Sequence, residues 1–151
     1  MCGIFGFVAP KPLPATLVVD ALRTLEYRGY DSWGIAYASQ RDRMSTLIVD
    51  KHAGRIPAAT AAYGATTIAL GHTRWATHGG VTDENAHPHL DCSGTLAIVH
   101  NGIIENYRVL REALERRGHR FRSDTDSEVF AHLLEEILAA SHTVEPNGTD
   151  P

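Results

Sequence analysis

The chain opens with Met1-Cys2-Gly3-Ile4-Phe5-Gly6-Phe7-Val8, a short apolar run behind a cysteine. The run predicts a buried strand that holds Cys2 at its N-terminal end. If Met1 is removed, Cys2 carries a thiol and a free α-amine, whose ordinary pKa values of roughly 8.5 and about 7.7–8.0 lie close together. Proton transfer between the two groups is then nearly isoenergetic, so the amine can act as the base that activates the thiol. The alternative is that Cys2 packs as a small apolar residue.

Composition narrows the class of protein. The 151 residues suffice for one domain with a buried core, and 43% hydrophobic with 21% charged residues is typical of a globular chain. A net charge of −4 argues against a nucleic-acid-binding surface, which would be basic. Two cysteines make no disulfide framework, and no apolar stretch approaches the ~18 residues of a membrane span. We therefore expect a cytoplasmic protein that binds neither nucleic acid nor membrane.

Hydrophobic periodicity predicts the order of the elements. After the first strand we expect a connection at Pro10–Pro14, strands at 34–38, 46–49, 66–71, 95–100 and 119–122, a hairpin loop at 40–43, and helices at 17–25, 55–63, 106–117 and from 125 onward. Asn106 is the expected cap of the third helix, and Thr125-x-x-Glu128 matches a capping box that opens the fourth. The last helix should bury its apolar residues, Val129, Phe130, Leu133, Leu134, Ile137 and Leu138. Strands and helices alternate irregularly, which favours an α+β protein of layered sheets and helices.

Residues at two strand ends and at one helix start could complete an amide-cleaving site around a cysteine. Asn101-Gly102 offers a side-chain amide and an unhindered backbone N–H, the composition of an oxyanion hole, although Asn-Gly is also a common turn dipeptide. The planar fork of Arg74 suits a substrate carboxylate, or else a surface ion pair. Asp126 could hold a substrate ammonium, or else compensate the dipole of the helix that it precedes.

Four histidines raise the question of a metal. They fall within eighteen residues of one another and are His72, His78, His87 and His89. Their spacings match no zinc pattern such as His-Glu-x-x-His, and no cysteine pair lies nearby. We therefore expect no metal and no cofactor.

Taken together, six ordered segments identify a family. They are Cys2-Gly3-Ile4-Phe5-Gly6, Leu25-Glu26-Tyr27-Arg28-Gly29-Tyr30-Asp31-Ser32, Gly71-His72-Thr73-Arg74-Trp75-Ala76-Thr77-His78-Gly79, Asn85-Ala86-His87-Pro88-His89, His100-Asn101-Gly102-Ile103-Ile104-Glu105-Asn106 and Ser123-Asp124-Thr125-Asp126. The segments closely resemble the glutaminase domain of glutamine–fructose-6-phosphate aminotransferase, a class II glutamine amidotransferase among the N-terminal-nucleophile hydrolases. Purine-pathway amidotransferases and asparagine synthetases fit them less well. The resemblance runs from Cys2 to about Ala140, so we expect a glutaminase domain over 1–140, and over 141–151 a polar tail or truncation point.

The resemblance implies a fold and a role for each matched residue. The fold is the layered α/β/β/α sandwich of the N-terminal-nucleophile type, expected here to be incomplete at its C-terminal end and so to expose strand edges and apolar faces. Cys2 would be the nucleophile, Asn101 and Gly102 the oxyanion hole, and Arg28 a support for the N-terminal strand. Arg74 would bind the glutamine carboxylate, Asp126 its amino group, and three residues would line or close the pocket, namely Trp75, Thr77 and His78.

The expected reaction is hydrolysis of the glutamine amide through a cysteinyl thioester. In the full family the ammonia passes to a synthase domain that acts on fructose 6-phosphate, and nothing in this chain corresponds to that domain. Three alternatives stay open: a non-catalytic remnant, a binding module, and the glutaminase domain of an amidotransferase with another acceptor. The chain could also form a homo-oligomer.

Overall fold

A computed structural model describes residues 1–39, 46–60, 62–76 and 79–142. Its elements are β1 (Gly3–Pro14), α1 (Thr16–Leu25), a 3₁₀ turn (Glu26–Arg28), β2 (Ser32–Ala38), β3 (Leu47–Ala53), β4 (Ala65–Arg74), β5 (His89–Leu90), β6 (Ala97–Ile98), α2 (Tyr107–Arg116) and α3 (Glu128–His142). The hairpin loop expected at 40–43 lies outside the described residues. None of the helices in the described part of the chain is both long and apolar enough to cross a membrane.

The larger sheet is antiparallel, with strand order β1-β4-β2-β3. Its register opposes Gly3 of β1 and Trp33 of β2 to the same residue of β4, Thr73. The start of β1 therefore lies beside the end of β4, so Cys2 and Arg74 meet although 72 residues separate them in the sequence. A strand presents alternate side chains to opposite faces, which puts His72 and Arg74 on one face and Gly71 and Thr73 on the other.

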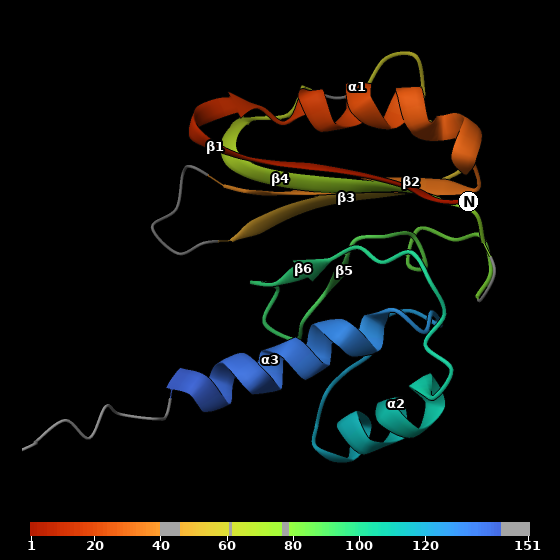
Figure 1. The fold of residues 1–151 in the computed structure, drawn as a ribbon, viewed down its shortest axis with the longest axis vertical. Coiled ribbons are helices and arrows are strands. Elements are labelled where there is room, and N and C mark those ends of the chain that lie inside the picture. The colour runs from red at the N-terminus through yellow and green to blue at the C-terminus, as the bar shows by residue number, and fades with distance from the viewer. Residues whose placement is uncertain (40–45, 61, 77–78, 143–151) are drawn as a thin grey trace, which may run out of the picture.

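Four layers follow one another in the order α, β, β, α, as Figure 1 shows from top to bottom. Helix α1 packs on β1 and β4, while α3 packs on the two-stranded β5–β6 sheet and α2 packs on α3. This arrangement is the expected α+β sandwich. The second sheet is smaller than expected, because the strand predicted over 95–100 is reduced to Ala97–Ile98 and pairs with β5, which the periodicity did not predict.

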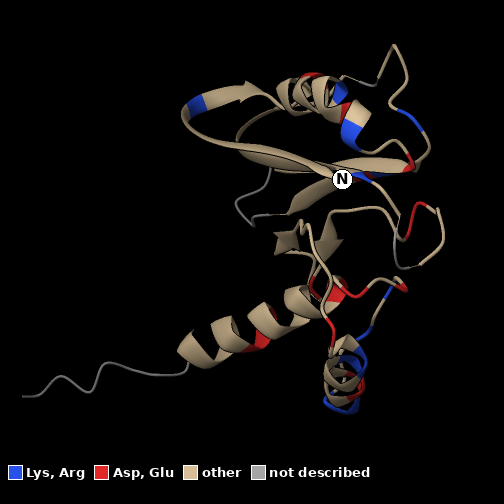
Figure 2. Ribbon diagram, turned by 45° about the vertical axis from the view of Figure 1, so that its right-hand side comes forward, with Lys and Arg blue, Asp and Glu red and all other residues tan. Residues whose placement is uncertain are grey.

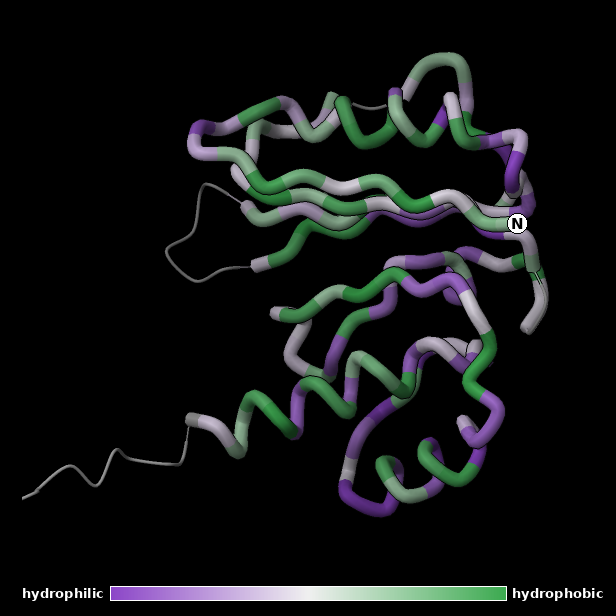
Figure 3. Tube along the Cα trace, viewed as in Figure 1, coloured by the Kyte–Doolittle hydropathy of each residue, from purple (hydrophilic) through white to green (hydrophobic). Residues whose placement is uncertain are grey.

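Two apolar clusters hold the outer layers in place. Val18, Val19 and Leu22 of α1 are fully buried against the larger sheet. The fit is close, because a Cβ at Gly71 would lie 2.6 Å from Val18 Cγ1. Ile104, Leu114 and Val129 join α2 to α3 in the second cluster. Figure 3 shows the hydrophobic residues following the strands, α1 and the length of α3. In Figure 2 acidic and basic residues are interspersed, and α2 carries both signs.

Two predictions near the N-terminus are wrong. The expected connection at Pro10–Pro14 is the end of β1, after a register shift between Val8 and Leu13. An edge strand tolerates prolines because their missing N–H groups would not face a neighbour. No helix forms in the described residues of the 55–63 range. There Ile56 N–H donates to Glu26 Oε1 at 2.7 Å and Arg23 Nη2 donates to Pro57 O at 3.0 Å. These bonds hold the segment against α1 and the 3₁₀ turn in a non-helical conformation.

The secondary structure predicted for the second half of the chain also needs correction. The expected strand at 119–122 does not form, because the N–H groups of Arg122 and Ser123 donate to the Glu128 carboxylate at 2.8 and 2.7 Å. Helix α3 therefore begins at Glu128, and the hydroxyl of Thr125 contacts His89 Nε2 at 2.9 Å instead of capping a helix. Asn106 makes no side-chain cap hydrogen bond to α2.

The apolar residues of α3 are less buried than their periodicity predicts. Val129 is buried, but four of the expected core residues are exposed, namely Phe130, Leu134, Ile137 and Leu138. Periodicity identifies the apolar face of a helix, whereas burial also requires an element to cover that face, and in the described chain β5 and β6 are too short to do so.

Candidate active site

Cys2 lies where β1 begins, directly beside the end of β4. Its Sγ accepts a hydrogen bond from Trp75 N–H at 3.2 Å and lies 3.8 Å from Trp75 O. Gly3 N–H donates to the Thr73 hydroxyl at 3.2 Å, which fixes the start of the strand. Arg28 Nε donates to Cys2 O at 3.5 Å. The backbone on both sides of the thiol is therefore held, while Met1 is 79% exposed and accessible to removal.

Asn101, in the segment that follows β6, approaches the same backbone. Its Nδ2 donates to Cys2 O at 3.3 Å, and its Oδ1 lies 2.8 Å from His72 Nε2. Because the amide nitrogen points at Cys2, Oδ1 must accept, and this hydrogen bond requires the proton on His72 Nε2. Burial lowers the pKa of His72 to about 4, so the ring is a neutral, single donor near pH 7. His72 thus orients the Asn101 amide towards the cysteine.

Glycine is required at position 102 for two reasons. Its φ of +154° is rarely adopted by residues with a side chain, and a Cβ there would lie 2.7 Å from His100 Nε2. The His100 ring is in turn held by Ser127 Oγ, 3.1 Å from Nδ1, and by an edge-to-face contact with Phe130. The start of α3 therefore supports the Asn101-Gly102 backbone beside Cys2.

Opposite charges lie near the thiol. Arg74 is 4% exposed and Asp126 is 5% exposed. Arg74 Nη1 donates to Gly80 O at 3.1 Å, while Asp126 Oδ2 accepts from Ile104 N–H at 2.6 Å. Burial lowers the pKa of Arg74, against the raising effect of the negative charges of Cys2, Asp31 and Asp126. The guanidinium and the carboxylate line one cavity together with Cys2.

The Tyr27–Ser32 motif anchors the end of β4. Asp31 N–H donates to Arg74 O at 3.0 Å, and Asp31 Oδ2 accepts from Ala76 N–H at 2.8 Å. Tyr30 makes an edge-to-face contact with the half-exposed Trp75, with ring centroids 5.5 Å apart. This motif therefore fixes the backbone that donates to the Cys2 thiol.

Two hollows meet at the cysteine. The inner one has a volume of about 30 Å³ and is lined by polar residues that include Cys2, Arg74 and Asp126. The outer one is a cleft of about 450 Å³ bordered by Cys2, Arg28 and Asn101. Both share Cys2, Trp75 and Gly102. The inner cavity alone has room for only a water or two, so a substrate of amino-acid size must extend into the cleft or widen the cavity.

Three buried histidines pack in a row beside the inner cavity, which His72 and His87 help to line. This row, called the histidine stack below, has one tilted and one edge-to-face ring contact. Ring centroids are 4.3 Å apart both between His72 and His87 and between His87 and His89. Burial lowers the pKa of His87 well below its ordinary value and that of His89 to about 3, so the stack is neutral. Among the described residues, neither ring nitrogen of His87 has a hydrogen-bond partner. The stacked rings pack the two layers together, and the described residues that could jointly hold a metal lie elsewhere, around Cys92.

Comparison with known proteins identifies the family. The model of the glutamine amidotransferase domain matches residues 37–146. The chain belongs to this family. The glutamine–fructose-6-phosphate aminotransferase (isomerizing) of Thermus thermophilus is 54% identical over 140 residues, which are 90% of this chain and 22% of that protein. The Pyrococcus horikoshii protein of the same name is 47% identical over 149 residues, 96% of this chain and 24% of that protein. The amidotransferase domain thus spans about a quarter of the length of the curated relatives that it matches.

Solved structures agree with this assignment. The glutamine phosphoribosylpyrophosphate amidotransferase of B. subtilis, complexed with ADP and GMP, superposes with a TM-score of 0.67 at 27% identity, over 89% of this chain and 29% of that one. A structure described as the allosteric regulatory enzyme of purine biosynthesis gives a TM-score of 0.70 at 29% identity over the same shares. The amidotransferase domain therefore has the α+β fold of the N-terminal-nucleophile type that the sequence predicted.

The structure brings most of the predicted site residues of the amidotransferase domain together. Around the two hollows lie Cys2, Arg28, Arg74, Trp75, Asn101, Gly102 and Asp126. Thr77 and His78 fall outside the described residues, and the roles assigned to all nine stay predictions. Sequence reasoning missed the supporting residues His72, His100, Ser127 and Asp31. All four stand inside or beside the quoted motifs, but nothing in those motifs shows which side chain each would contact.

Proposed function

We propose that this amidotransferase domain hydrolyses the side-chain amide of glutamine, with Cys2 as the nucleophile once Met1 has been removed. One observation carries the proposal: a thiol, a buried guanidinium and a buried carboxylate line the same cavity. An α-amino acid presents one carboxylate and one ammonium, so Arg74 and Asp126 match its two charges while leaving its side chain for Cys2.

The chemistry follows from the placement of donors. The freed α-amine of Cys2 takes the thiol proton as Sγ attacks the amide carbon, and negative charge develops on the amide oxygen. Asn101 Nδ2 and the Gly102 N–H are the proposed donors to that oxygen. Collapse of the tetrahedral intermediate breaks the C–N bond, the ammonium of Cys2 returns its proton to the leaving nitrogen, and a γ-glutamyl thioester remains. Water, deprotonated by the same amine, then releases glutamate and restores the thiol.

The proposal includes the fate of the ammonia. Both named relatives are glutamine–fructose-6-phosphate aminotransferases, and this chain is 47–54% identical to their corresponding parts. We therefore propose that the ammonia serves amino-sugar synthesis in the cytoplasm, with fructose 6-phosphate bound by a synthase domain outside this chain. The structural likeness to a phosphoribosylpyrophosphate amidotransferase keeps another acceptor as the second candidate, at a lower identity of 27%.

The test is the intact mass of the full chain before and after exposure to an electrophilic glutamine analogue, with Cys2→Ala as control. We expect loss of Met1, a single adduct on the wild-type chain and none on Cys2→Ala. A chain that lacks Met1 and takes up no adduct, yet still melts cooperatively, would overturn the catalytic proposal in favour of a non-catalytic remnant or binding module. If Met1 is still attached, it is first removed with an aminopeptidase and the labelling repeated.

A further inference from the structure

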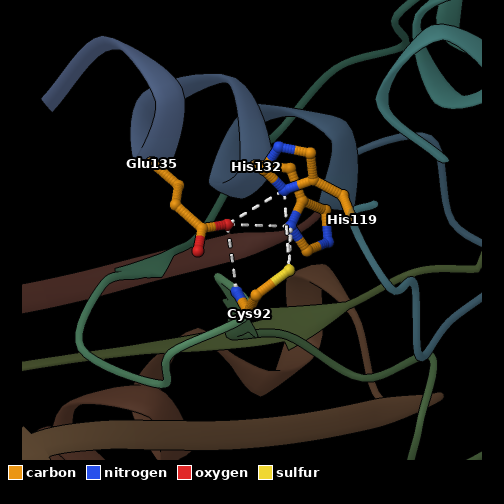
Figure 4. Close-up of side chains that lie close together, drawn as sticks. All are labelled: Cys92, His119, His132 and Glu135. Atoms are coloured by element: carbon orange, nitrogen blue, oxygen red, sulfur yellow. Dashed lines mark hydrogen bonds and ion pairs between the residues drawn. The ribbon is translucent and has the colours of Figure 1, made fainter. Parts of the chain in front are cut away.

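A second group of reactive side chains lies away from Cys2, on the outer side of the second sheet. Cys92 comes from the turn between β5 and β6, and His119 from the segment that joins α2 to α3. His132 and Glu135 stand three residues apart on one face of α3. Figure 4 shows the four side chains converging. The atoms that face one another are Sγ of Cys92, Nδ1 of each histidine and Oε2 of Glu135. All four ligand atoms lie within 4.8 Å of one another.

We propose that Cys92, His119, His132 and Glu135 bind a divalent transition-metal ion of the zinc type in a closed, four-coordinate site. The proposal does not depend on the glutaminase activity, and it departs from the sequence analysis, which predicted no metal.

Four of the six distances between the ligand atoms are close to those of a tetrahedral zinc site. Ordinary zinc bond lengths of about 2.3 Å to sulfur, about 2.0 Å to nitrogen and about 2.0 Å to oxygen imply edges of about 3.6 Å for S···N and about 3.3 Å for N···O. Cys92 Sγ lies 3.5 Å from Nδ1 of His119 and 3.5 Å from Nδ1 of His132. Glu135 Oε2 lies 3.0 Å from Nδ1 of His119 and 3.4 Å from Nδ1 of His132. The two remaining edges, between the two Nδ1 atoms and between Sγ and Oε2, are at most 4.8 Å. Four of the six edges are therefore those of a metal-centred tetrahedron.

The donor types select the ion. One thiolate, two imidazoles and one carboxylate suit zinc and disfavour magnesium or calcium, which prefer oxygen ligands. The thiolate and the carboxylate together balance the two positive charges of the ion. Four protein ligands leave no open position, which is the pattern of a structural site rather than a catalytic one.

Groups around the cluster are those that support metal ligands. Histidine ligands usually donate their second ring N–H to a carboxylate, which fixes the ring and raises its basicity. His119 Nε2 lies 3.1 Å from Glu136 Oε1, and His132 Nε2 lies 3.7 Å from Glu128 Oε1. The Arg120 N–H donates to Cys92 Sγ at 3.5 Å, as suits a thiolate. His119 thus already has the carboxylate partner that a metal-bound imidazole takes. His132 Nε2 makes no hydrogen bond within the described residues, and Glu128 is the carboxylate that a small shift of the ring would bring into range.

The ion would tie three segments into one unit. It would join the β5–β6 turn and the α2–α3 connection to α3. Phe130 of α3, and Ser127 just before it, also support the active site through His100. The second sheet has only two short strands in the described chain, so a metal link would supply stability that strand pairing does not.

The experiment titrates Co²⁺ and then Zn²⁺ into the full chain after chelator treatment, at neutral pH. Cobalt is the probe because a cysteine ligand produces an intense thiolate-to-metal charge-transfer band. We expect one cobalt per chain, displacement of the cobalt by zinc, and a higher melting temperature with zinc. Cys2→Ala, in which Cys92 is the one remaining thiol, should keep the band. Cys92→Ser should lose it, and Glu135→Gln should weaken the affinity at least about tenfold, since even outer-shell changes act on that scale.

The control for histidine is His52→Gln, because His52 is a half-exposed residue of β3 that pairs with Asp50 outside the cluster. It should bind cobalt like the wild type. The absence of stoichiometric binding, a band that survives Cys92→Ser, or a band lost in Cys2→Ala would each overturn the proposal. The spectrum of Cys2→Ala decides the question even if a variant in the cluster does not fold.

Discussion

The two cysteines of this chain have different surroundings. Cys2 faces a cleft at a strand end, accepts a backbone N–H and lies in a cavity with a buried arginine and aspartate. Cys92 lies on a turn within reach of two imidazoles and a carboxylate. The first environment suits a nucleophile that faces a cleft, whereas the second surrounds the sulfur with groups that suit the proposed metal ion. The neighbours of a thiol, more than the thiol itself, indicate whether it acts as a nucleophile or as a ligand.

Substitution of each cysteine tests this comparison, and Cys2 should give the largest change of all the variants. Cys2→Ala should abolish glutamine hydrolysis, since loss of a nucleophile costs on the order of 10⁶ in kcat in a well-studied hydrolase, and should leave the melting temperature nearly unchanged. Cys92→Ser should keep most of the turnover below its own melting temperature and lose the stabilisation by zinc. Glutamine turnover and thermal melting of both variants measure this. Substantial turnover by Cys2→Ala would contradict the mechanism.

The donors beside Cys2 should have the next largest effect. Asn101→Ala should lower kcat by roughly 10²–10³, the usual loss for one oxyanion donor. His72→Phe removes the group that orients the Asn101 amide, and we expect a loss of up to about 10², the scale of misplacing a catalytic group by 1 Å. If His72 acts through Asn101, the double variant should be no slower than Asn101→Ala. Additive losses in the steady-state rates would argue against that positioning role.

Arg74→Lys should act mainly on substrate binding. Lysine keeps the charge but loses the planar fork, and hydrogen bonds to charged groups contribute about 1.5–3 kcal/mol, so KM should rise about 10–100-fold with a smaller change in kcat. Asp126→Asn should raise KM in the same way. The KM for glutamine measures both, and a melting curve controls for the buried position of Arg74. An unchanged KM in both variants would show that other residues recognise glutamine.

The histidine stack predicts how stability depends on pH. Burial lowers the pKa values of His72 to about 4 and of His89 to about 3, and that of His87 well below 6.5. The unfolded chain binds these protons below about pH 6.5 and the folded chain does not, so the free energy of unfolding is highest above that pH and falls as the pH drops towards 4.

His87→Phe tests the contribution of one histidine to this pH dependence of the free energy of unfolding. Each neutral histidine contributes a slope of at most about 1.4 kcal/mol per pH unit, and the variant should lose that amount of slope between about pH 6 and about pH 4.5. Denaturant unfolding over this range measures the slope, which does not depend on whether phenylalanine packs slightly better or worse. His52→Gln is the matched control. An unchanged slope in His87→Phe would show that His87 is protonated in the fold.

Prediction from sequence worked best for residues at strand ends, which the structure gathers around two adjoining cavities. Cys2, Arg74 and Asn101 were identified because each follows or precedes an apolar run, and antiparallel pairing then brings such ends together. It failed where the contacts are between side chains far apart in sequence. Glu128 fits a capping box, yet it binds the N–H groups of Arg122 and Ser123 and so replaces an expected strand. The local sequence signal for the proposed metal site is limited to His132-x-x-Glu135 on one helix face.

The sequence by itself identified the family and predicted the nucleophile, the layered fold and the strand ends at which site residues stand. These follow from hydrophobic periodicity and from motifs of a few adjacent residues. The tertiary structure decided that His72 orients Asn101, that three histidines stack as neutral rings, and that Cys92 meets His119, His132 and Glu135. Those outcomes depend on which distant side chains are brought within about 3 Å, and on the water excluded around them, neither of which is encoded in any local stretch.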